Sequence, residues 1–394
     1  RIEVWEPSTG TRLTTVPAAT IDDAEAAVAA ARRALASGPW SRMKPNERQR
    51  LLLGLADLVE ARARTIAEIE TLDNGKALGP CLETDVLGGA DLLRYMAGYA
   101  TKIHGATREV SAQGQHLAFT VKEPIGVVAA IVPWNWPFNM AMWKMAAPLA
   151  AGCTVVLKPA QQTSLSMLYF SELCEEAGVP AGVVNVVTGS GSLIGSHLAG
   201  HRGVDKVSFT GSTPVGRAVG EAAGRALSPV TLELGGKSPM VAFADADLEA
   251  LAEATRWSVY FNAGQVCSAG SRLYVERSAF ERAVEAVARV ADAMVLAPGL
   301  DPKCDMGPVI SRAQYDSVCG YLDLARDEGA AVACGGEPLD RDGWFIRPTL
   351  LTAESNSLRV VQEEIFGPVL VALPFDDEEE ALRLANDSVF GLAA

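Results

Sequence analysis

The sequence has few of the residues on which several common catalytic devices depend. It holds only 4 histidines, and none lies near Cys267 in the sequence, so a Cys–His pair could form only through folding. Its 7 cysteines are scattered and include no Cys-x-x-Cys pair. This spacing favours reduced thiols over a disulfide framework or a zinc site, and we expect no metal.

Long apolar runs and an excess of basic residues are also missing. No run approaches about 18 uninterrupted apolar residues, and residues 1–6 lack the charged and apolar regions of a signal peptide. We therefore expect a cytoplasmic protein that does not act at a membrane. With 34 basic residues against 48 acidic ones, the net charge of −14 also argues against a nucleic-acid surface.

What the sequence does contain is enough apolar material for two domains, since 49% of its 394 residues are hydrophobic. Helical periodicity predicts a helix over 21–37 and two helices between 47 and 72. Residues 117–124 alternate like an exposed strand or arm. From 126 to 233 strands and helices alternate, which is typical of a parallel sheet, and a second α/β series begins after 237 with a strand at 239–242 that we expect to be buried.

The thiol of Cys267 is the best candidate for a nucleophile. It lies in a loop of small residues, 262–271, that follows a predicted helix over 247–262 and precedes a predicted strand at 273–275. The reactive species is the thiolate, which is only a small fraction of an ordinary cysteine at neutral pH, so the chain must also supply an activator.

Glu233 is the candidate base. It ends the apolar strand 230–233 and is followed by Gly235 and Gly236, whose turn leaves the carboxylate at a strand C-terminus, where open α/β sheets bind ligands. A partly buried carboxylate there is suited to general-base work. The alternative is a glutamate that only caps a turn.

Asn135 also follows a buried strand, 126–132, in the run Pro-Trp-Asn-Trp-Pro at 133–137. Its side-chain amide and the backbone N–H of Cys267 could bind an oxyanion together. Asparagine between prolines and aromatic residues is also favourable turn chemistry, so this motif alone decides little.

Two strand ends predict a cofactor site. Gly211 and Ser212 lie between the strand 207–209 and a predicted helix, and a helix N-terminus with free N–H groups favours an anion such as phosphate. Lys158 and Gln161 follow the strand 155–157, where they could hydrogen-bond a ribose. The glycine-rich loop 189–195 resembles a dinucleotide fingerprint with one residue too many, and we interpret it as structural.

Taken together, six motifs resemble the aldehyde dehydrogenase superfamily in order and spacing, over essentially the whole chain. They lie at 133–137, 157–160, 209–212, 232–239, 264–267 and 363–368. The resemblance implies an α/β fold with a Rossmann-like NAD(P)-binding domain at 1–100 and 124–235, an oligomerisation arm at 101–123 and a catalytic domain at 236–394. It also implies NAD or NADP as cofactor and a homodimer or homotetramer.

The same resemblance implies a role for each candidate. Cys267 would attack an aldehyde, Asn135 would bind the oxyanion, and Glu233 would activate water to release the acid. Lys144 resembles a lysine near the cofactor and the proton path. The implied cofactor contacts are Trp134, Lys158, Gln161, Gly211, Ser212, Glu364 and Phe366.

Two departures from the family pattern matter. Gln161 stands where the family commonly has a glutamate that repels a 2′-phosphate, so we expect NADP to be accepted as well as NAD. Family members also continue beyond the segment similar to 386–394, which predicts a truncated chain.

Three other functions remain open: a CoA-acylating dehydrogenase, a cysteine-dependent esterase and a structural protein on the same fold. Glu233 as water activator favours hydrolysis over CoA acylation. The segment 95–105 is similar to that of broad-specificity and arylacetaldehyde members, which favours an aromatic or medium apolar aldehyde.

Overall fold

A computed structural model describes all residues, 1–394, and they form two compact units. The first unit comprises 1–2, 16–67 and 82–233, and the second comprises 3–15, 68–81 and 234–394. The second unit thus includes two segments that the sequence grouped with the cofactor domain. Both are tied to it by backbone hydrogen bonds, from Trp344 N to Pro7 O (3.0 Å) and from Leu78 N to Gly299 O (2.9 Å).

The first unit contains the predicted parallel sheet, with strand order β7-β6-β5-β8-β9. Its strands are β5 (Val127–Ile131), β6 (Thr154–Lys158), β7 (Val184–Val186), β8 (Lys206–Thr210) and β9 (Val230–Glu233). All residues of β5 and β6 are buried, which explains their continuous apolar runs, because helices cover both faces of such a sheet. The predicted α/β architecture is confirmed.

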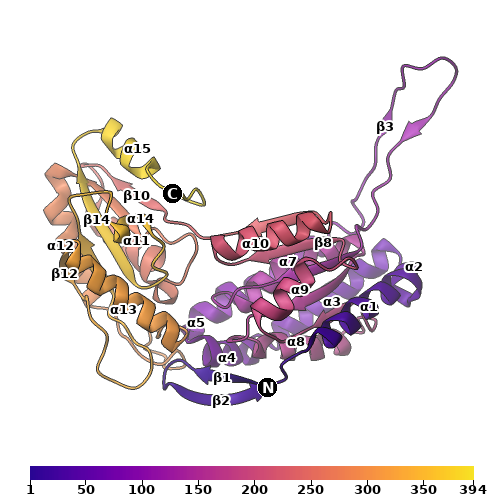
Figure 1. Ribbon diagram of the computed structural model, residues 1–394, viewed down its shortest axis with the longest axis horizontal. Coiled ribbons are helices and arrows are strands. Elements are labelled where there is room, and N and C mark those ends of the chain that lie inside the picture. Colours follow the sequence, from indigo (N-terminus) through magenta and orange to yellow (C-terminus); the bar gives the residue numbers. More distant parts are fainter. The chain divides into compact units, whose positions relative to one another are not determined.

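Helices flank this sheet (Figure 1). They are α1 (Ile21–Ser37), α2 (Pro39–Arg42), α3 (Pro45–Ala61), α6 (Gly88–Ala97), α7 (Pro137–Ala151), α8 (Leu165–Glu176), α9 (Ser196–Ala199) and α10 (Thr213–Arg225), with α4 (Ala63–Asn74) shared between the units. The helix predicted over 21–37 is confirmed, and so are the two between 47 and 72. Helix α1 begins where the side chains of Thr20 and Asp23 each accept a hydrogen bond from the other's backbone N–H, which satisfies two donors of the first turn.

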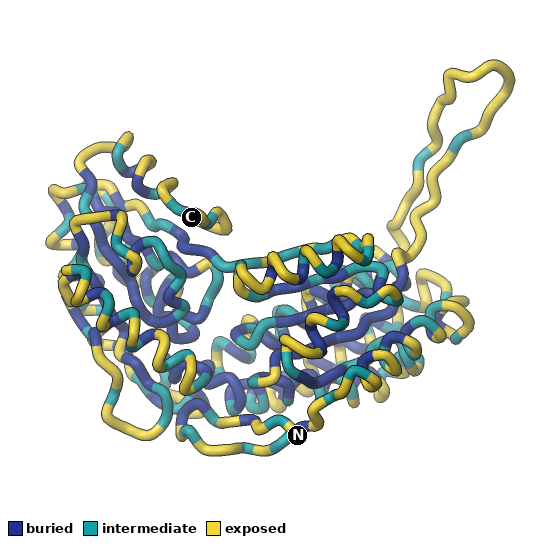
Figure 2. The backbone as a smooth tube through the Cα atoms, viewed as in Figure 1, coloured by how far each residue is buried: buried dark blue, intermediate teal, exposed yellow.

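A two-stranded arm leaves the first unit between α6 and β5. Strands β3 (Thr107–Arg108) and β4 (Ala118–Phe119) pair antiparallel, and the arm projects away from the sheet and its helices (Figure 1). Nearly all of it is exposed (Figure 2), including Leu117 at 80%. The strand predicted at 117–124 is therefore shorter than expected, and its apolar side chains are not covered by this chain.

The second unit has its own sheet, with order β10-β11-β14-β13-β12. Its strands are β10 (Pro239–Ala242), β11 (Arg272–Glu276), β12 (Ala331–Cys334), β13 (Thr349–Thr352) and β14 (Val369–Phe375). The prediction that 239–242 is buried is wrong, because β10 is an edge strand and Val241 is 41% exposed. A hairpin of β1 (Ile2–Glu6) and β2 (Thr11–Val16) was not predicted.

The remaining helices include α11, which is shorter than predicted. Helix α11 (Leu248–Thr255) gives way to a π-helical turn (Arg256–Tyr260) and a 3₁₀ turn (Phe261–Gly264) before the Cys267 loop. The others are α5 (Leu78–Pro80), α12 (Phe280–Asp292), α13 (Arg312–Asp327), α14 (Arg359–Gln362) and α15 (Glu378–Asn386). None of the helices combines the length and apolar character needed to cross a membrane.

Candidate active and cofactor site

Several candidates of the first unit lie at one edge of its sheet. Asn135 follows β5, Lys158 ends β6 and Glu233 ends β9, and the strands of this sheet are parallel. The chain passes from β5 to β6 on one side, while β8 pairs with β5 on the other. The C-terminal end of β5 is therefore the switch point at which open α/β sheets bind ligands.

The loop that carries Trp134 and Asn135 is short and fixed at both ends. Asn135 is only 4% exposed, and Pro137 occupies the first turn of α7, a position that needs no N–H donor. Trp134 is half-buried. The proline that follows the loop therefore also starts the helix that carries Lys144.

Lys144 lies on α7 and is buried. Its Nζ is 3.3 Å from Ser208 Oγ on β8. Burial lowers the pKa of Lys144 to about 8, while attraction by Glu233 opposes the shift and repulsion by Lys206 adds to it. Lys144 can thus exchange a proton near neutral pH, in the electrostatic field of Glu233.

Glu233 itself is exposed, in contrast to the partial burial expected from its position at a strand end. Its backbone carbonyl accepts the N–H of Gly211 at 3.1 Å, which joins the end of β9 to the start of α10. A Cβ on Gly211 would lie 2.6 Å from Phe209 Cζ, so any other residue there would displace the aromatic ring. Ser212 is the N-cap of α10, and its side chain makes no capping hydrogen bond.

Lys158 and Gln161 differ in environment. Lys158 is 4% exposed, and burial lowers its pKa to about 8, whereas Gln161 is exposed. A Cβ on Gly195 would lie 3.7 Å from Lys158 Cδ, so the π-helical turn Gly191–Gly195 stands beside this lysine. The loop 189–195 therefore borders the cofactor candidates.

In the second unit, three successive residues with positive φ precede Cys267 and set the shape of its loop. Asn262, Ala263 and Gly264 have φ values of 49°, 53° and 72°. Only glycine fits at 264, because a Cβ there would lie 1.9 Å from Gly367 O. Gln265, which the sequence analysis did not single out, is fully buried, and its Oε1 accepts the N–H of Ile310 at 2.8 Å.

The segment after Glu233 meets both remaining candidate loops. Gly236 N donates to Glu364 Oε1 at 3.2 Å, and a Cβ on Gly236 would lie 2.5 Å from Cys267 O. A Cβ on Gly235 would lie only 2.1 Å from Glu364 Oε2. The two glycines therefore let the backbone of 235–236 pass directly between the Glu364 carboxylate and the Cys267 loop.

Glu364 and Phe366 are both half-buried, and Phe366 has a left-handed φ of 56°. Burial raises the pKa of Glu364, while the Gly236 N–H and the charge of Lys237 lower it. A cavity of about 10 Å³, lined in part by Gly236, Gly264 and Glu364, adjoins these loops and has room for about one water molecule.

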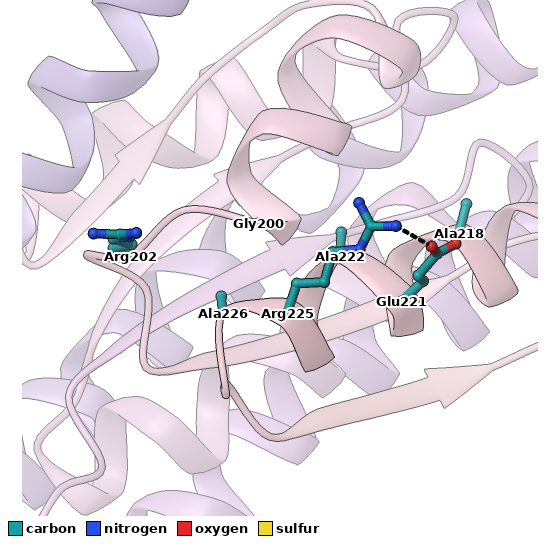
Figure 3. Close-up of a pocket in the computed structure, with 7 residues that line it drawn as sticks. All are labelled: Gly200, Arg202, Ala218, Glu221, Ala222, Arg225 and Ala226. Atoms are coloured by element: carbon teal, nitrogen blue, oxygen red, sulfur yellow. Dashed lines mark hydrogen bonds and ion pairs between the residues drawn. The ribbon is translucent and has the colours of Figure 1, made fainter.

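A larger hollow elsewhere on the first unit contains none of the candidates. It has a volume of about 340 Å³ and is lined by Gly200, Arg202, Ala218, Glu221, Ala222, Arg225 and Ala226 (Figure 3). Arg225 is paired with Glu221 at 2.5 Å. The carboxylate in this lining is thus held by an arginine, and none of the candidate nucleophile, base or cofactor residues lies there.

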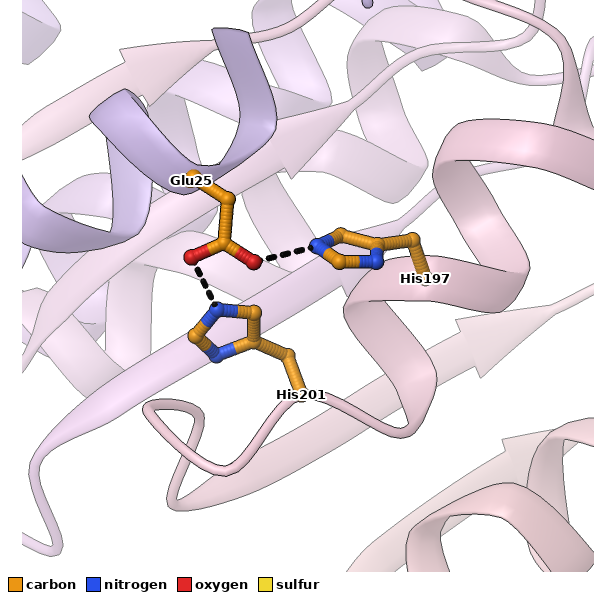
Figure 4. A group of neighbouring side chains, drawn as sticks. All are labelled: Glu25, His197 and His201. Carbon is orange, nitrogen blue, oxygen red and sulfur yellow. Dashed lines mark hydrogen bonds and ion pairs between the residues drawn. The ribbon is translucent and has the colours of Figure 1, made fainter. Parts of the chain in front are cut away.

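Glu25, His197 and His201 form a cluster that the sequence analysis did not predict (Figure 4). Each ring Nε2 lies 2.9 Å from a different oxygen of Glu25. Gly203 N donates to His201 Nδ1 at 2.7 Å, so in the neutral ring the proton is on Nε2, which donates to Glu25 and lowers the pKa of that carboxyl. A histidine that binds a metal ion would need the Nε2 lone pair, whereas here Nε2 of His201 carries the proton. We therefore interpret the cluster as a set of hydrogen bonds that links α1 to the region of α9.

Comparison with known proteins decides the family. The sequence profile described as the aldehyde dehydrogenase family matches residues 1–394. The chain belongs to the aldehyde dehydrogenase family. The expected superfamily resemblance is confirmed, and this aldehyde dehydrogenase oxidises aldehydes with NAD or NADP.

Individual relatives and a solved structure that are similar to this chain are also dehydrogenases by name. The chain is 46% identical to phenylacetaldehyde dehydrogenase of Pseudomonas fluorescens, covering 100% of this chain and 80% of that protein. It is 45% identical to human retinal dehydrogenase 2, covering 99% and 76%. The structure of the NAD⁺ complex of an aldehyde dehydrogenase from Bacillus cereus superposes with a TM-score of 0.97 at 45% identity, covering 99% of this chain and 79% of that one.

Proposed function

We propose that this aldehyde dehydrogenase forms a covalent thioester on Cys267 and releases a free carboxylic acid by hydrolysis. The observation that carries the proposal is the path of residues 233–236. Within three residues of Glu233, the backbone hydrogen-bonds Glu364 and packs against the backbone of Cys267. The turn that directly follows the proposed base therefore lies against both the proposed nucleophile loop and the proposed cofactor contact.

In the first step the Cys267 thiolate adds to the aldehyde carbon, and the carbonyl oxygen becomes an oxyanion. Asn135, held in its buried loop, and the Cys267 N–H donate hydrogen bonds to that oxygen. The C–H bond of the resulting thiohemiacetal is then broken, and its hydride leaves, so that a thioester remains on Cys267.

Bound NAD(P) supplies the hydride acceptor for this step. The chain offers residues that fit it: buried Lys158 and exposed Gln161 for the adenosine ribose, and Gly211 and Ser212 at the start of α10 for phosphate. Glu364 would accept hydrogen bonds from the nicotinamide ribose hydroxyls.

Two half-buried aromatic residues, Trp134 and Phe366, would lie beside the bound cofactor.

Glu233 then takes a proton from water, which attacks the thioester and releases the acid and the Cys267 thiolate. Its exposure leaves it accessible to water. Lys144, with a pKa of about 8 in the field of Glu233, can pass the proton onward.

We further propose a cofactor domain formed by 1–100 and 124–235, a catalytic domain at 236–394 and an arm at 101–123 through which copies assemble into a homodimer or homotetramer. The exposed apolar side chains of the arm support its role in assembly. We also propose a cytoplasmic location.

The substrate is an aromatic or medium apolar aldehyde. The similarity to a phenylacetaldehyde dehydrogenase supports this class. A turnover series over aldehydes of graded size tests it, and a preference for short polar aldehydes would contradict it.

The mechanism is tested by following reduced-nicotinamide absorbance and acid formation with aldehyde and NAD. We expect acid without added CoA, and Cys267→Ala should abolish turnover while the dissociation constant of NAD is unchanged. Acid that forms only with CoA would favour the acylating alternative. Ester cleavage without reduced nicotinamide would favour an esterase.

A further inference from the structure

Lys237, directly after the Gly235–Gly236 turn, is a buried cation that the mechanism above does not use. The residue is 2% exposed, and its Nζ has no hydrogen-bond partner in the chain. Buried amines without partners are rare, because the charged form loses its hydration. Such a group needs a physical explanation.

Among the charged groups around Lys237, Glu364 is the acidic group best able to interact with it. Glu364 and Glu363 attract the Lys237 ammonium, and Arg272 repels it. Glu363 is already held by the side chains of Arg359 (2.6 Å) and Tyr321 (2.8 Å). Glu364 is the acidic group that accepts a hydrogen bond from Gly236, the residue next to Lys237.

Arg272 does not compete for Glu364, because its guanidinium is satisfied elsewhere. It donates to Lys237 O (2.7 Å), Tyr274 Oη (3.0 Å) and, at the negative end of α15, Leu384 O (3.3 Å) and Ala385 O (2.8 Å). It contributes positive potential near Lys237 but no bond to a carboxylate.

We propose that Lys237 is a positioning residue that keeps Glu364 ionised and turned towards the nicotinamide ribose. The inference rests on the proposed role of Glu364 as the ribose contact. An ionised carboxylate accepts hydrogen bonds on both oxygens, whereas a protonated one must place a proton on one of them. The charge of Lys237 thereby acts on cofactor binding through Glu364.

The effect of Lys237 on NAD binding should depend on pH, because burial shifts the pKa values of both Glu364 and Lys237. Burial raises the pKa of Glu364, so this carboxyl approaches protonation as the pH falls. Burial also lowers the pKa of Lys237 to about 7, so Lys237 gains its proton as the pH falls below neutrality. The Lys237 cation therefore forms as the pH falls, in the same direction in which Glu364 approaches protonation.

The test measures the dissociation constant of NAD by calorimetry from about pH 6 to about pH 8 for the native chain, Lys237→Met, Lys237→Arg and Glu364→Gln. Lys237→Met should weaken NAD binding about tenfold at the acidic end and much less at the basic end. Lys237→Arg should restore most of the acidic-end affinity. Glu364→Gln should weaken binding with little dependence on pH, and adding Lys237→Met to it should change little.

A merely structural lysine predicts a different pattern. Lys237→Met should leave the melting temperature unchanged or raise it, because it removes an unpaired buried charge that Arg272 repels. A lowered melting temperature with NAD affinity unchanged at the acidic end overturns the inference. If Lys237→Met does not fold, Lys237→Gln gives the same neutral comparison.

The proposed ribose contact of Glu364 and the role of Lys237 can be tested separately. If Glu364→Gln binds NAD as the native chain does, the proposed ribose contact is wrong and the inference falls with it. If Glu364→Gln weakens binding and Lys237→Met does not, only the inference about Lys237 is wrong.

Discussion

Gly235→Ala tests whether the close approach of backbone to the Glu364 carboxylate matters for cofactor binding. The added Cβ would lie 2.1 Å from Glu364 Oε2, and Cβ atoms essentially never come within 3.0 Å of a neighbouring atom. The φ of Gly235 is not in the left-handed region, so alanine brings no backbone strain of its own. The carboxylate must therefore move by about 1 Å.

A displacement of that size breaks the bond from Gly236 N to Glu364 Oε1 and misplaces both oxygens for a ribose. Loss of one hydrogen bond to a charged group costs about 1.5–3 kcal/mol. We therefore expect the dissociation constant of NAD to rise about 10- to 100-fold. Isothermal calorimetry measures it directly, and a KM for NAD that rises with kcat nearly unchanged would agree.

The matched control is Gly320→Ala, in α13 of the same unit, where an added Cβ meets nothing within 4 Å. It should bind NAD normally and be slightly more stable, by about 0.5–1 kcal/mol. Native affinity in Gly235→Ala would refute the reasoning. So would an equal loss in the Glu364→Ala background, because the effect must act through the end of that side chain.

Three further outcomes follow from the site. Glu233→Gln should give a burst of reduced nicotinamide and then stall at the thioester, and unimpaired steady turnover in a stopped-flow assay would remove Glu233 from the role of base. Gln161→Glu should lower kcat/KM for NADP about tenfold or more relative to NAD by like-charge repulsion of the 2′-phosphate, and an unchanged ratio would contradict this. Lys144→Met should stabilise the fold in urea by about 1–3 kcal/mol at neutral pH, because protonated Lys144 is buried at a cost. Since the pKa of Lys144 is about 8 when folded and 10.5 in the reference state, that gain should vanish as the pH rises between these values, and a gain independent of pH would refute the cause.

Much of the first unit's sheet could be predicted because its strands are buried on both faces and read as unbroken apolar runs. Strands β5 and β6 were found in this way, and the candidates Asn135, Lys158 and Glu233 were recognised as strand ends. Strand β10 reads as equally apolar, but it lies at a sheet edge with Val241 exposed. Hydrophobicity along a strand does not reveal how many neighbours the strand has.

Other features could not be predicted from the sequence because they depend on contacts between residues far apart in the chain. Gln265 is buried and its Oε1 accepts a hydrogen bond from the Ile310 N–H, and the only local signal was a polar residue between small and apolar ones. Lys237 stands in a similar position, a charge between a Gly-Gly turn and an apolar strand. Segments 3–15 and 68–81 join the second unit through bonds to residues near 299 and 344.

The sequence by itself determined the family and the order of the strand-helix units, and it supplied the candidates for the nucleophile, the base and the oxyanion donor. These are encoded in local patterns, since each motif spans a strand end and the turn that follows it. Only the tertiary structure decided that Glu233 is exposed, that Gly235 is glycine because Glu364 lies against it, and that Lys237 is buried without a partner. Clearance and burial depend on atoms that approach from elsewhere in the chain, and no local pattern specifies them.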